Sequence, residues 1–384
     1  MMPTTALAGA RIFDGSRWHD DAAVLIGDGA IVAICPRRDV PGDARLEVLD
    51  GGLLAPGFID AQVNGGGGVL LNDDPTSGAM VHIAQAHRPF GTCRLLPTLV
   101  TTTRERTDAA LRAARAAGGG VLGLHLEGPY LSPKRRGVHD DKAMAAMADA
   151  DIDWLLSVGV GRLLLTVAPE QVTPDQVRRL VDGGAVVSLG HSDASYEQAM
   201  ALINAGASGV THLFNAMSGL QSRAPGMVGA ALDAGAAWCG FIADGLHVAV
   251  PTLRIALRAK RAPGRLFLVT DAMPTVGSPI GEFMLGDRCI LRRGDRLVWI
   301  GEDGEEVLAG AHLDMASAVR FCVSTLELPI DEALRMASLY PARFLRLSDR
   351  FGSIAPGYAA DLVHLDAGLR VTRTWIAREA TSSA

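Results

Sequence analysis

Residues 162–193 read RLLLTVAPEQVTPDQVRRLVDGGAVVSLGHSD, and this stretch contains the repeating unit that decides the fold. An apolar run at 162–167 precedes a segment of helical pattern at 174–182, and a second apolar run follows at 185–189. Short apolar runs between turn signals predict buried strands, and the segment between them predicts a helix. The second run ends in Gly190-His191-Ser192-Asp193, so polar side chains stand where the predicted strand stops.

The same unit recurs along most of the chain. Eight apolar runs follow one another, at 58–63, 93–100, 121–126, 162–167, 185–189, 209–214, 237–243 and 265–270. Helical segments separate most of them, for example 107–117, 196–205 and 251–261. Eight such repeats predict an α/β protein with a (β/α)8 TIM-type barrel. A doubly wound open sheet is the alternative, but it normally needs fewer strands and a glycine-rich phosphate-binding turn, which we do not find.

The two chain ends have a different pattern. Short apolar runs at 24–26 and 31–34 flank an Asp-Gly turn, which predicts a hairpin. Pro56-Gly57 marks a boundary, and strand character returns at 360–363. We therefore expect a small β-sandwich-like domain built from residues 1–54 and 352–384, beside a barrel domain of residues 55–351.

Composition excludes several functional classes. The 384 residues include 36 Lys and Arg against 42 Asp and Glu, and the net charge of −6 argues against a general nucleic-acid binder. The apolar runs are shorter than a membrane span of about 18 residues, and the first ten residues lack a signal-peptide pattern. Five scattered cysteines form no CxxC pair, which suits a reducing compartment. We expect a cytoplasmic protein with neither a nucleic-acid nor a membrane partner.

The candidate chemistry lies at the strand ends, because the active site of a (β/α)8 barrel forms there. Glu127, His191, His212 and Asp271 end predicted strands 3, 5, 6 and 8. One such residue alone is more often structural, but four together indicate a site. One carboxylate oxygen and two imidazole nitrogens suit zinc with an open coordination position. Asp271 would stand beside the water on that metal, where a carboxylate can take a proton and pass it to a leaving group.

Seven motifs in a fixed order carry a family resemblance. They are PGFID at 56–60, QVNG at 62–65, LHLEGPY at 124–130, GHS at 190–192, THLFNAM at 211–217, DGLH at 244–247 and TDAM at 270–273. In these motifs the chain resembles the N-acetylglucosamine-6-phosphate deacetylases of the amidohydrolase superfamily. The resemblance implies metal-dependent hydrolysis of N-acetyl-D-glucosamine 6-phosphate to D-glucosamine 6-phosphate and acetate, in amino-sugar catabolism and cell-wall sugar recycling.

The motifs also indicate how many metal ions to expect. Most amidohydrolases carry a His-x-His pair on strand 1, and many bridge two metals with a carbamylated lysine on strand 4. Here the pair is Gln62 and Asn64, and none of the three lysines ends a barrel strand. We therefore expect one divalent ion per subunit, zinc, on the strand-end cluster. A second, vestigial site at Gln62 and Asn64 is the weaker alternative, because amide oxygens are poor zinc ligands.

The resemblance further implies which residues bind the substrate. His139 would meet the acetyl carbonyl, and Asn215, Ala216, Arg223 and His247 would bind the sugar phosphate. In the family this arginine can come from the neighbouring subunit, which implies a homodimer. The family usually has Arg-Glu-Pro-Gly, whereas this chain has an alanine after the arginine, so the geometry of this loop stays open.

Other readings remain open at this stage. The substrate could be a related one such as N-acetylgalactosamine 6-phosphate, or the chain could be an N-acyl amino acid amidohydrolase on the same scaffold. A non-enzymatic barrel is a different class, and the intact cluster counts against it. We expect Lys134, Arg135 and Arg136 to form a solvated loop face and His125 to be a structural histidine of the barrel core.

Overall fold

Eight parallel strands form the central sheet, in the order β17-β16-β15-β14-β13-β12-β11-β8. They are β8 (Phe58–Val63), β11 (Thr92–Val100), β12 (Gly123–Glu127), β13 (Arg162–Val167), β14 (Val186–Leu189), β15 (Gly209–Val210), β16 (Trp238–Ile242) and β17 (Leu266–Val269). The structure is a computed structural model and describes residues 4–301 and 304–377. A parallel bridge between Val63 and Ala272, and a 3.0 Å hydrogen bond from the Asp271 N–H to the Gln62 carbonyl, close the sheet into a barrel. The predicted (β/α)8 fold is confirmed.

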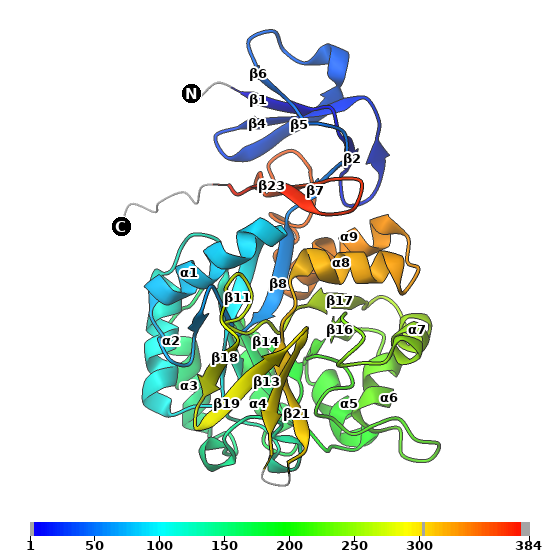
Figure 1. Cartoon of the computed structure of the whole chain (residues 1–384). Coiled ribbons are helices and arrows are strands. Elements are labelled where there is room, and N and C mark those ends of the chain that lie inside the picture. Colours follow the sequence, from blue (N-terminus) through cyan, green and yellow to red (C-terminus); the bar gives the residue numbers. More distant parts are fainter. Residues whose placement is uncertain (1–3, 302–303, 378–384) are drawn as a thin grey trace.

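Helices cover the outside of this barrel (Figure 1). They are α1 (Ser77–His87), α2 (Arg104–Ala116), α3 (Asp149–Ser157), α4 (Pro174–Asp182), α5 (Tyr196–Asn204), α6 (Gly226–Asp233), α7 (Val250–Ala259), α8 (Met315–Ser324), α9 (Ile330–Ala337) and α10 (Leu339–Phe344). Short 3-10 helices lie in the connections: η1 (Arg37–Asp39) between β-strands of the N-terminal region, and η2 (Arg88–Phe90), η3 (Pro133–Arg135) and η4 (Asp141–Ala143) within the barrel part of the chain. Among the described residues, no helix is both long and apolar enough to span a membrane.

Helix α4 shows why the local sequence folds as it does. The Thr173 side chain caps the helix by accepting from the Gln176 N–H, and the Gln176 side chain accepts in return from the Thr173 N–H. Proline at the first helical position needs no hydrogen bond there. Val177 and Leu180 are buried in the core between helix and barrel. These features agree with the boundaries expected from the sequence for this helix.

Both chain ends contribute to a smaller β region beside the barrel (Figure 1). Its sheets have the orders β5-β4-β1-β6 and β23-β22-β7-β2-β3. The strands are β1 (Thr5–Ala8), β2 (Arg11–Phe13), β3 (Trp18–His19), β4 (Ala22–Gly27), β5 (Ala30–Pro36), β6 (Arg45–Val48), β7 (Leu53–Pro56), β22 (Leu362–Leu365) and β23 (Val371–Trp375). Leu7, Ile354 and Leu362 share one apolar core. The prediction that both chain ends build these sheets is thus confirmed. The domain boundaries stay a prediction, and residues 1–3 and 378–384 lie outside the described residues.

A buried ion pair joins the barrel to this region. Nε of Arg94, on β11, lies 2.6 Å from Oδ2 of Asp361, which directly precedes β22. The exposed fractions of the two side chains are only 1% and 7%. The Asp361 carboxylate also accepts from the backbone N–H of Ala377. Because a buried charge needs its partner, this pair fixes how the two parts of the chain meet.

An antiparallel sheet inserted after β17 reaches the mouth of the barrel. Its strands are β18 (Glu282–Leu285), β19 (Arg288–Arg293), β20 (Arg296–Ile300) and β21 (Glu306–Ala311), and a second small sheet pairs β9 (Gly65–Gly66) with β10 (Val69–Leu70). The Ala311 N–H donates to the Asp271 carbonyl at 2.9 Å, and the Met273 N–H donates to the Ala311 carbonyl at 3.1 Å. Figure 1 shows this sheet in yellow across the barrel. The insertion is therefore anchored where β17 ends.

Candidate active site

Three side chains meet at the C-terminal ends of the strands. Glu127 ends β12, His191 follows β14 and His212 follows β15. Nε2 of His191 and Nε2 of His212 lie 3.1 and 2.9 Å from Oε1 of Glu127, and 3.1 Å from each other. All three side chains are buried. The expected ligand set therefore converges on one point, although the three residues are far apart in the sequence.

The protonation pattern of this cluster favours a cation at its centre. Nδ1 of His191 lies 2.9 Å from the Arg135 carbonyl, which can only accept, so a neutral His191 carries its proton there. Its Nε2 then presents a lone pair to a carboxylate oxygen of Glu127, and two acceptors face each other at 3.1 Å. Burial alone would raise the pKa of Glu127, but its contacts with the rings of His191 and His212 lower it well below its usual range, so the carboxylate is ionised. One oxygen and two nitrogens in this arrangement fit a divalent ion.

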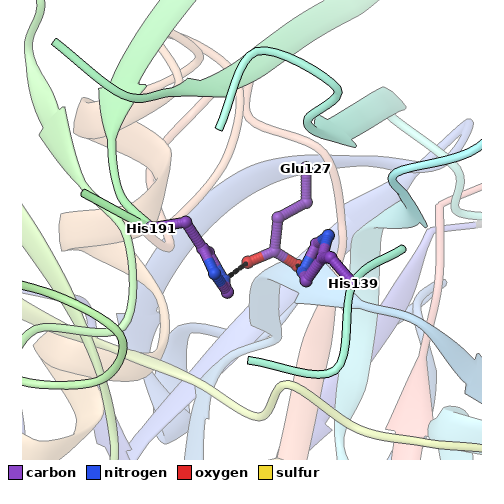
Figure 2. Close-up of side chains that lie close together, drawn as sticks. All are labelled: Glu127, His139 and His191. Atoms are coloured by element: carbon purple, nitrogen blue, oxygen red, sulfur yellow. Dashed lines mark hydrogen bonds and ion pairs between the residues drawn. The ribbon is translucent and has the colours of Figure 1, made fainter. Parts of the chain in front are cut away.

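His139 lies beside this cluster. The ligand atoms of Glu127, His139 and His191 are within 4.8 Å of one another, and Figure 2 shows the carboxylate between the two rings. Nε2 of His139 is, however, 4.0 Å from Oε2 of Glu127. Nδ1 of His139 lies 2.9 Å from Oγ1 of Thr101 and 3.4 Å from the Thr101 backbone nitrogen, and burial lowers the pKa of His139 to about 3, so the ring is neutral. The shorter distances from Nε2 of His212 to Glu127 and His191 favour His212 over His139 as the third ligand.

Asp271 faces the cluster from the end of β17 and is held by two amides. Nδ2 of Asn64 donates to its Oδ1 at 2.6 Å, and Nε2 of Gln62 donates to the same oxygen at 3.2 Å. The Gln62 amide also donates to Oε1 of Glu127 at 3.2 Å. Burial and the negative charge of Glu127 raise the pKa of Asp271 to about 6. The nitrogens of both amides (Gln62 and Asn64, the amide clamp) thus face carboxylates, while Oδ1 of Asn64 is buried and has no hydrogen-bond partner among the described residues, so a second metal site there stays a prediction.

Strained backbone marks the same positions. His191, His212 and Asp271 have φ values of 46°, 30° and 52°, and Ala216 has 50°. This left-handed region costs a residue with a side chain about 1–3 kcal/mol and persists where the surrounding structure enforces it, often at functional sites. His191, His212 and Asp271 each lie two residues after the last residue of a strand, so the strained positions mark the turns at the barrel mouth.

The cluster lies in a cavity of about 330 Å³. Its wall contains Asn64, Val100, Glu127, Lys134, Arg135, Gly137, Val138, His139, His191, His212, Asn215, Ala216, Ile242, His247, Asp271, Met273, Leu308 and Gly310. The predicted substrate residues His139, Asn215, Ala216 and His247 therefore share one cavity with the cluster. Arg223 is exposed and is not part of this wall within the described chain.

Several wall residues were not expected from the sequence. Lys134 and Arg135 line the cavity, although their loop was expected only to face solvent; the Lys134 side chain is 79% exposed at the rim. Leu308 and Gly310 come from β21 of the inserted sheet. Asp244 holds His247, with 2.6 Å between Oδ2 and Nδ1. The three-residue spacing of Asp244 and His247 could have indicated this pair, whereas no sequence signal places β21 here.

The fold and the cavity define a hydrolase-type barrel with a candidate metal centre at its strand ends. A family model described as the amidohydrolase family matches residues 53–380, and one described as the NagA composite domain matches residues 5–54. The chain therefore belongs to the amidohydrolase family.

Individual relatives of this chain carry more specific names than the family model does. The chain is 42% identical over 379 residues to an N-acetylgalactosamine-6-phosphate deacetylase of Shewanella sp. (strain ANA-3), with 97% of this chain and 94% of that protein covered. It is 34% identical over 349 residues to an N-acetylglucosamine-6-phosphate deacetylase of Haemophilus influenzae, with 89% and 90% covered. The crystal structure of N-acetylglucosamine-6-phosphate deacetylase from Pasteurella multocida matches with a TM-score of 0.92 at 33% identity, covering 97% of this chain and 98% of that one.

Proposed function

We propose that this protein hydrolyses N-acetyl-D-glucosamine 6-phosphate to D-glucosamine 6-phosphate and acetate. The observation that carries the proposal is the convergence of Glu127, His191 and His212 opposite Asp271 in one cavity. Relatives that are named N-acetylglucosamine-6-phosphate deacetylases, such as the Haemophilus influenzae protein, support this substrate. N-acetylgalactosamine 6-phosphate is a second candidate, because relatives at 42% and 37% identity bear the name of its deacetylase. None of the relatives named here supports an N-acyl amino acid as substrate.

The donor set fits one divalent ion per subunit, and we propose zinc. Such an ion, when bound, lowers the pKa of water and polarises a carbonyl. Asp271 takes the proton of the attacking water at Oδ2, because the amide clamp occupies Oδ1. It delivers this proton to the amine nitrogen as the C–N bond of the acetamide breaks. His139 donates from Nε2 to the carbonyl oxygen as negative charge builds there.

The other end of the cavity would bind the sugar phosphate. Asn215, Ala216 and His247 line it, and the hydrogen bond between Asp244 and Nδ1 of His247 leaves Nε2 of the ring for the ligand. Arg223 is exposed, so we propose that it completes the phosphate site of a neighbouring subunit in a homodimer. We also propose a cytoplasmic location and a division of the chain into residues 1–54 with 352–384 and residues 55–351.

One experiment distinguishes the candidate substrates and tests the metal requirement. Acetate release is measured with four substrates: N-acetylglucosamine 6-phosphate, N-acetylgalactosamine 6-phosphate, unphosphorylated N-acetylglucosamine and an N-acetyl amino acid. We expect the highest kcat/KM for N-acetylglucosamine 6-phosphate, and metal analysis of the same preparation should find one ion per chain. A preference for the galactosamine compound would establish the second candidate. Equal rates with and without phosphate, or full activity without metal, would contradict the proposal.

A further inference from the structure

The two histidines of the candidate metal centre differ in what their second ring nitrogen contacts. Nδ1 of His191 has the Arg135 carbonyl at 2.9 Å. Nδ1 of His212 is buried and has no hydrogen-bond partner among the described residues. The carbonyl of His212 itself already accepts from the backbone and side-chain nitrogens of Asn215, at 2.9 and 3.1 Å. One of the two rings therefore lacks the partner that fixes the other.

This missing partner matters for metal binding. A neutral imidazole that gives its Nε2 lone pair to a metal carries its proton on Nδ1. Metal-bound histidines almost always donate this second N–H to a carboxylate, a carbonyl or a water, and buried donors are rarely left without an acceptor. His212 is only 4% exposed, so bulk solvent does not supply that acceptor. An acceptor outside the polypeptide is therefore expected.

A small internal cavity has His212 in its wall. Its volume is about 10 Å³, and a cavity needs about 10–15 Å³ of such volume to hold one water molecule. Besides His212, the wall contains the polar residues Gln62, His125, Ser188 and Thr211, and the remaining wall residues are apolar. A water there has the several polar partners that buried waters normally require.

A chain of hydrogen bonds crosses the barrel at this level. Nε2 of His125 lies 2.7 Å from Oγ1 of Thr166. Oγ1 of Thr211 lies 2.7 Å from Oγ1 of Thr166 and 2.7 Å from Oγ of Ser188. All four side chains are buried. A hydroxyl offers one donor and two acceptor positions, so the hydroxyls at the Ser188 end retain capacity for a further partner. The chain thus ends in groups that can hold a water in the cavity.

We propose that this internal cavity holds one ordered water, which accepts the Nδ1 proton of His212 and is held by the hydroxyls of Ser188 and Thr211. The water fixes the tautomer of His212, so that Nε2 keeps its lone pair for the metal. Ser188 and Thr211 are then positioning residues that act through the water. The inference rests on the metal that the proposed function assigns to Nε2.

Filling the cavity tests the proposal without touching a polar group. In Gly240→Ala the new methyl would meet Val269 at 3.2 Å and Phe267 at 3.4 Å, and all three residues line the cavity. Ser188→Ala removes a polar anchor instead. Thr92→Val is the matched control, because Thr92 is buried at the start of β11 and its hydroxyl has no hydrogen-bond partner within the described part of the chain.

Zinc affinity is measured on the metal-free full chain by competition with a chelator, together with the melting temperature of each metal-free protein. We expect Gly240→Ala and Ser188→Ala to bind zinc about 10–100-fold more weakly, as other losses of such outer partners do. Thr92→Val should bind zinc as the parent does. Unchanged affinity in both variants, even with lowered melting temperatures, would show a merely structural role and overturn the proposal.

A second measurement needs no variant. In the zinc-loaded parent with nitrogen-15 histidine, NMR should show a slowly exchanging proton on Nδ1 of His212 with a cross-peak to a bound water. A proton on Nε2, or no water contact, would overturn the inference while leaving deacetylation intact. A parent that binds no zinc would overturn both this inference and the proposed metal.

Discussion

Replacing Asp271 with asparagine removes the proposed base and leaves the rest of the cavity in place. In Asp271→Asn an oxygen can remain at Oδ1 to accept from Asn64 and Gln62, now at 2.6 and 3.2 Å, while an amide nitrogen replaces Oδ2. General acid–base catalysis contributes about 10²–10⁴-fold. At about 1.36 kcal/mol per tenfold, this corresponds to about 3–5 kcal/mol of the barrier. We therefore expect kcat to fall at least about 100-fold.

Metal content and substrate binding separate this loss of catalysis from a loss of structure. Glu127, His191 and His212 are unchanged in the variant, so purified Asp271→Asn should hold as much metal as the parent. Calorimetry should still detect binding of N-acetylglucosamine 6-phosphate, because the phosphate end of the cavity is untouched. If the variant purified without metal, Asp271 would have to be a ligand. If turnover stayed near normal, the base would lie elsewhere, with His139 the first candidate.

Three further changes test other parts of the structure. His212→Ala should lose both bound metal and acetate release; metal retained at the parental level would exclude His212 as a ligand. Arg223→Ala should raise KM for the phosphorylated sugar and leave unphosphorylated N-acetylglucosamine little affected, because a guanidinium binds phosphate through two hydrogen bonds; equal losses on both would indicate a structural role. Asp361→Ala removes the carboxylate that faces the buried Arg94 guanidinium and should lower the free energy of unfolding by about 3–5 kcal/mol. Asp20→Ala, which breaks an exposed ion pair with Arg11, should lower it by less than about 1 kcal/mol in the same urea titration, and equal effects would refute the argument.

The fold and the centre of the site were predictable because both depend on local order along the chain. Alternating apolar runs and helical segments predict the barrel, and parallel strands bring their polar ends to one mouth. The residues at four of those ends, Glu127, His191, His212 and Asp271, do share one cavity. The resemblance then added His139, Asn215 and His247, which spacing alone does not connect to the cluster.

The rim of the cavity was not predictable in the same way. Leu308 and Gly310 reach it because the inserted sheet pairs with the end of β17, and a hairpin pattern does not reveal where the hairpin docks. Lys134 is a charged residue on an exposed loop, and its position beside the cavity depends on how that loop folds back. Arg223 lies on an exposed loop outside the cavity wall of the described chain, and the role we propose for it in a neighbouring subunit would leave no trace in the contacts of a single chain.

The amide clamp bears on how such a centre could change during evolution. Gln62 and Asn64 each differ from histidine by one nucleotide substitution in their codons, so a His-x-His pair is two steps away. After the first step the chain would have lost one donor to Asp271 and would not yet possess a complete second metal site. Such an intermediate holds its base less firmly and gains nothing in return. For the one-metal centre that we propose, the geometry therefore opposes the first of these two steps, although the mutational distance is short.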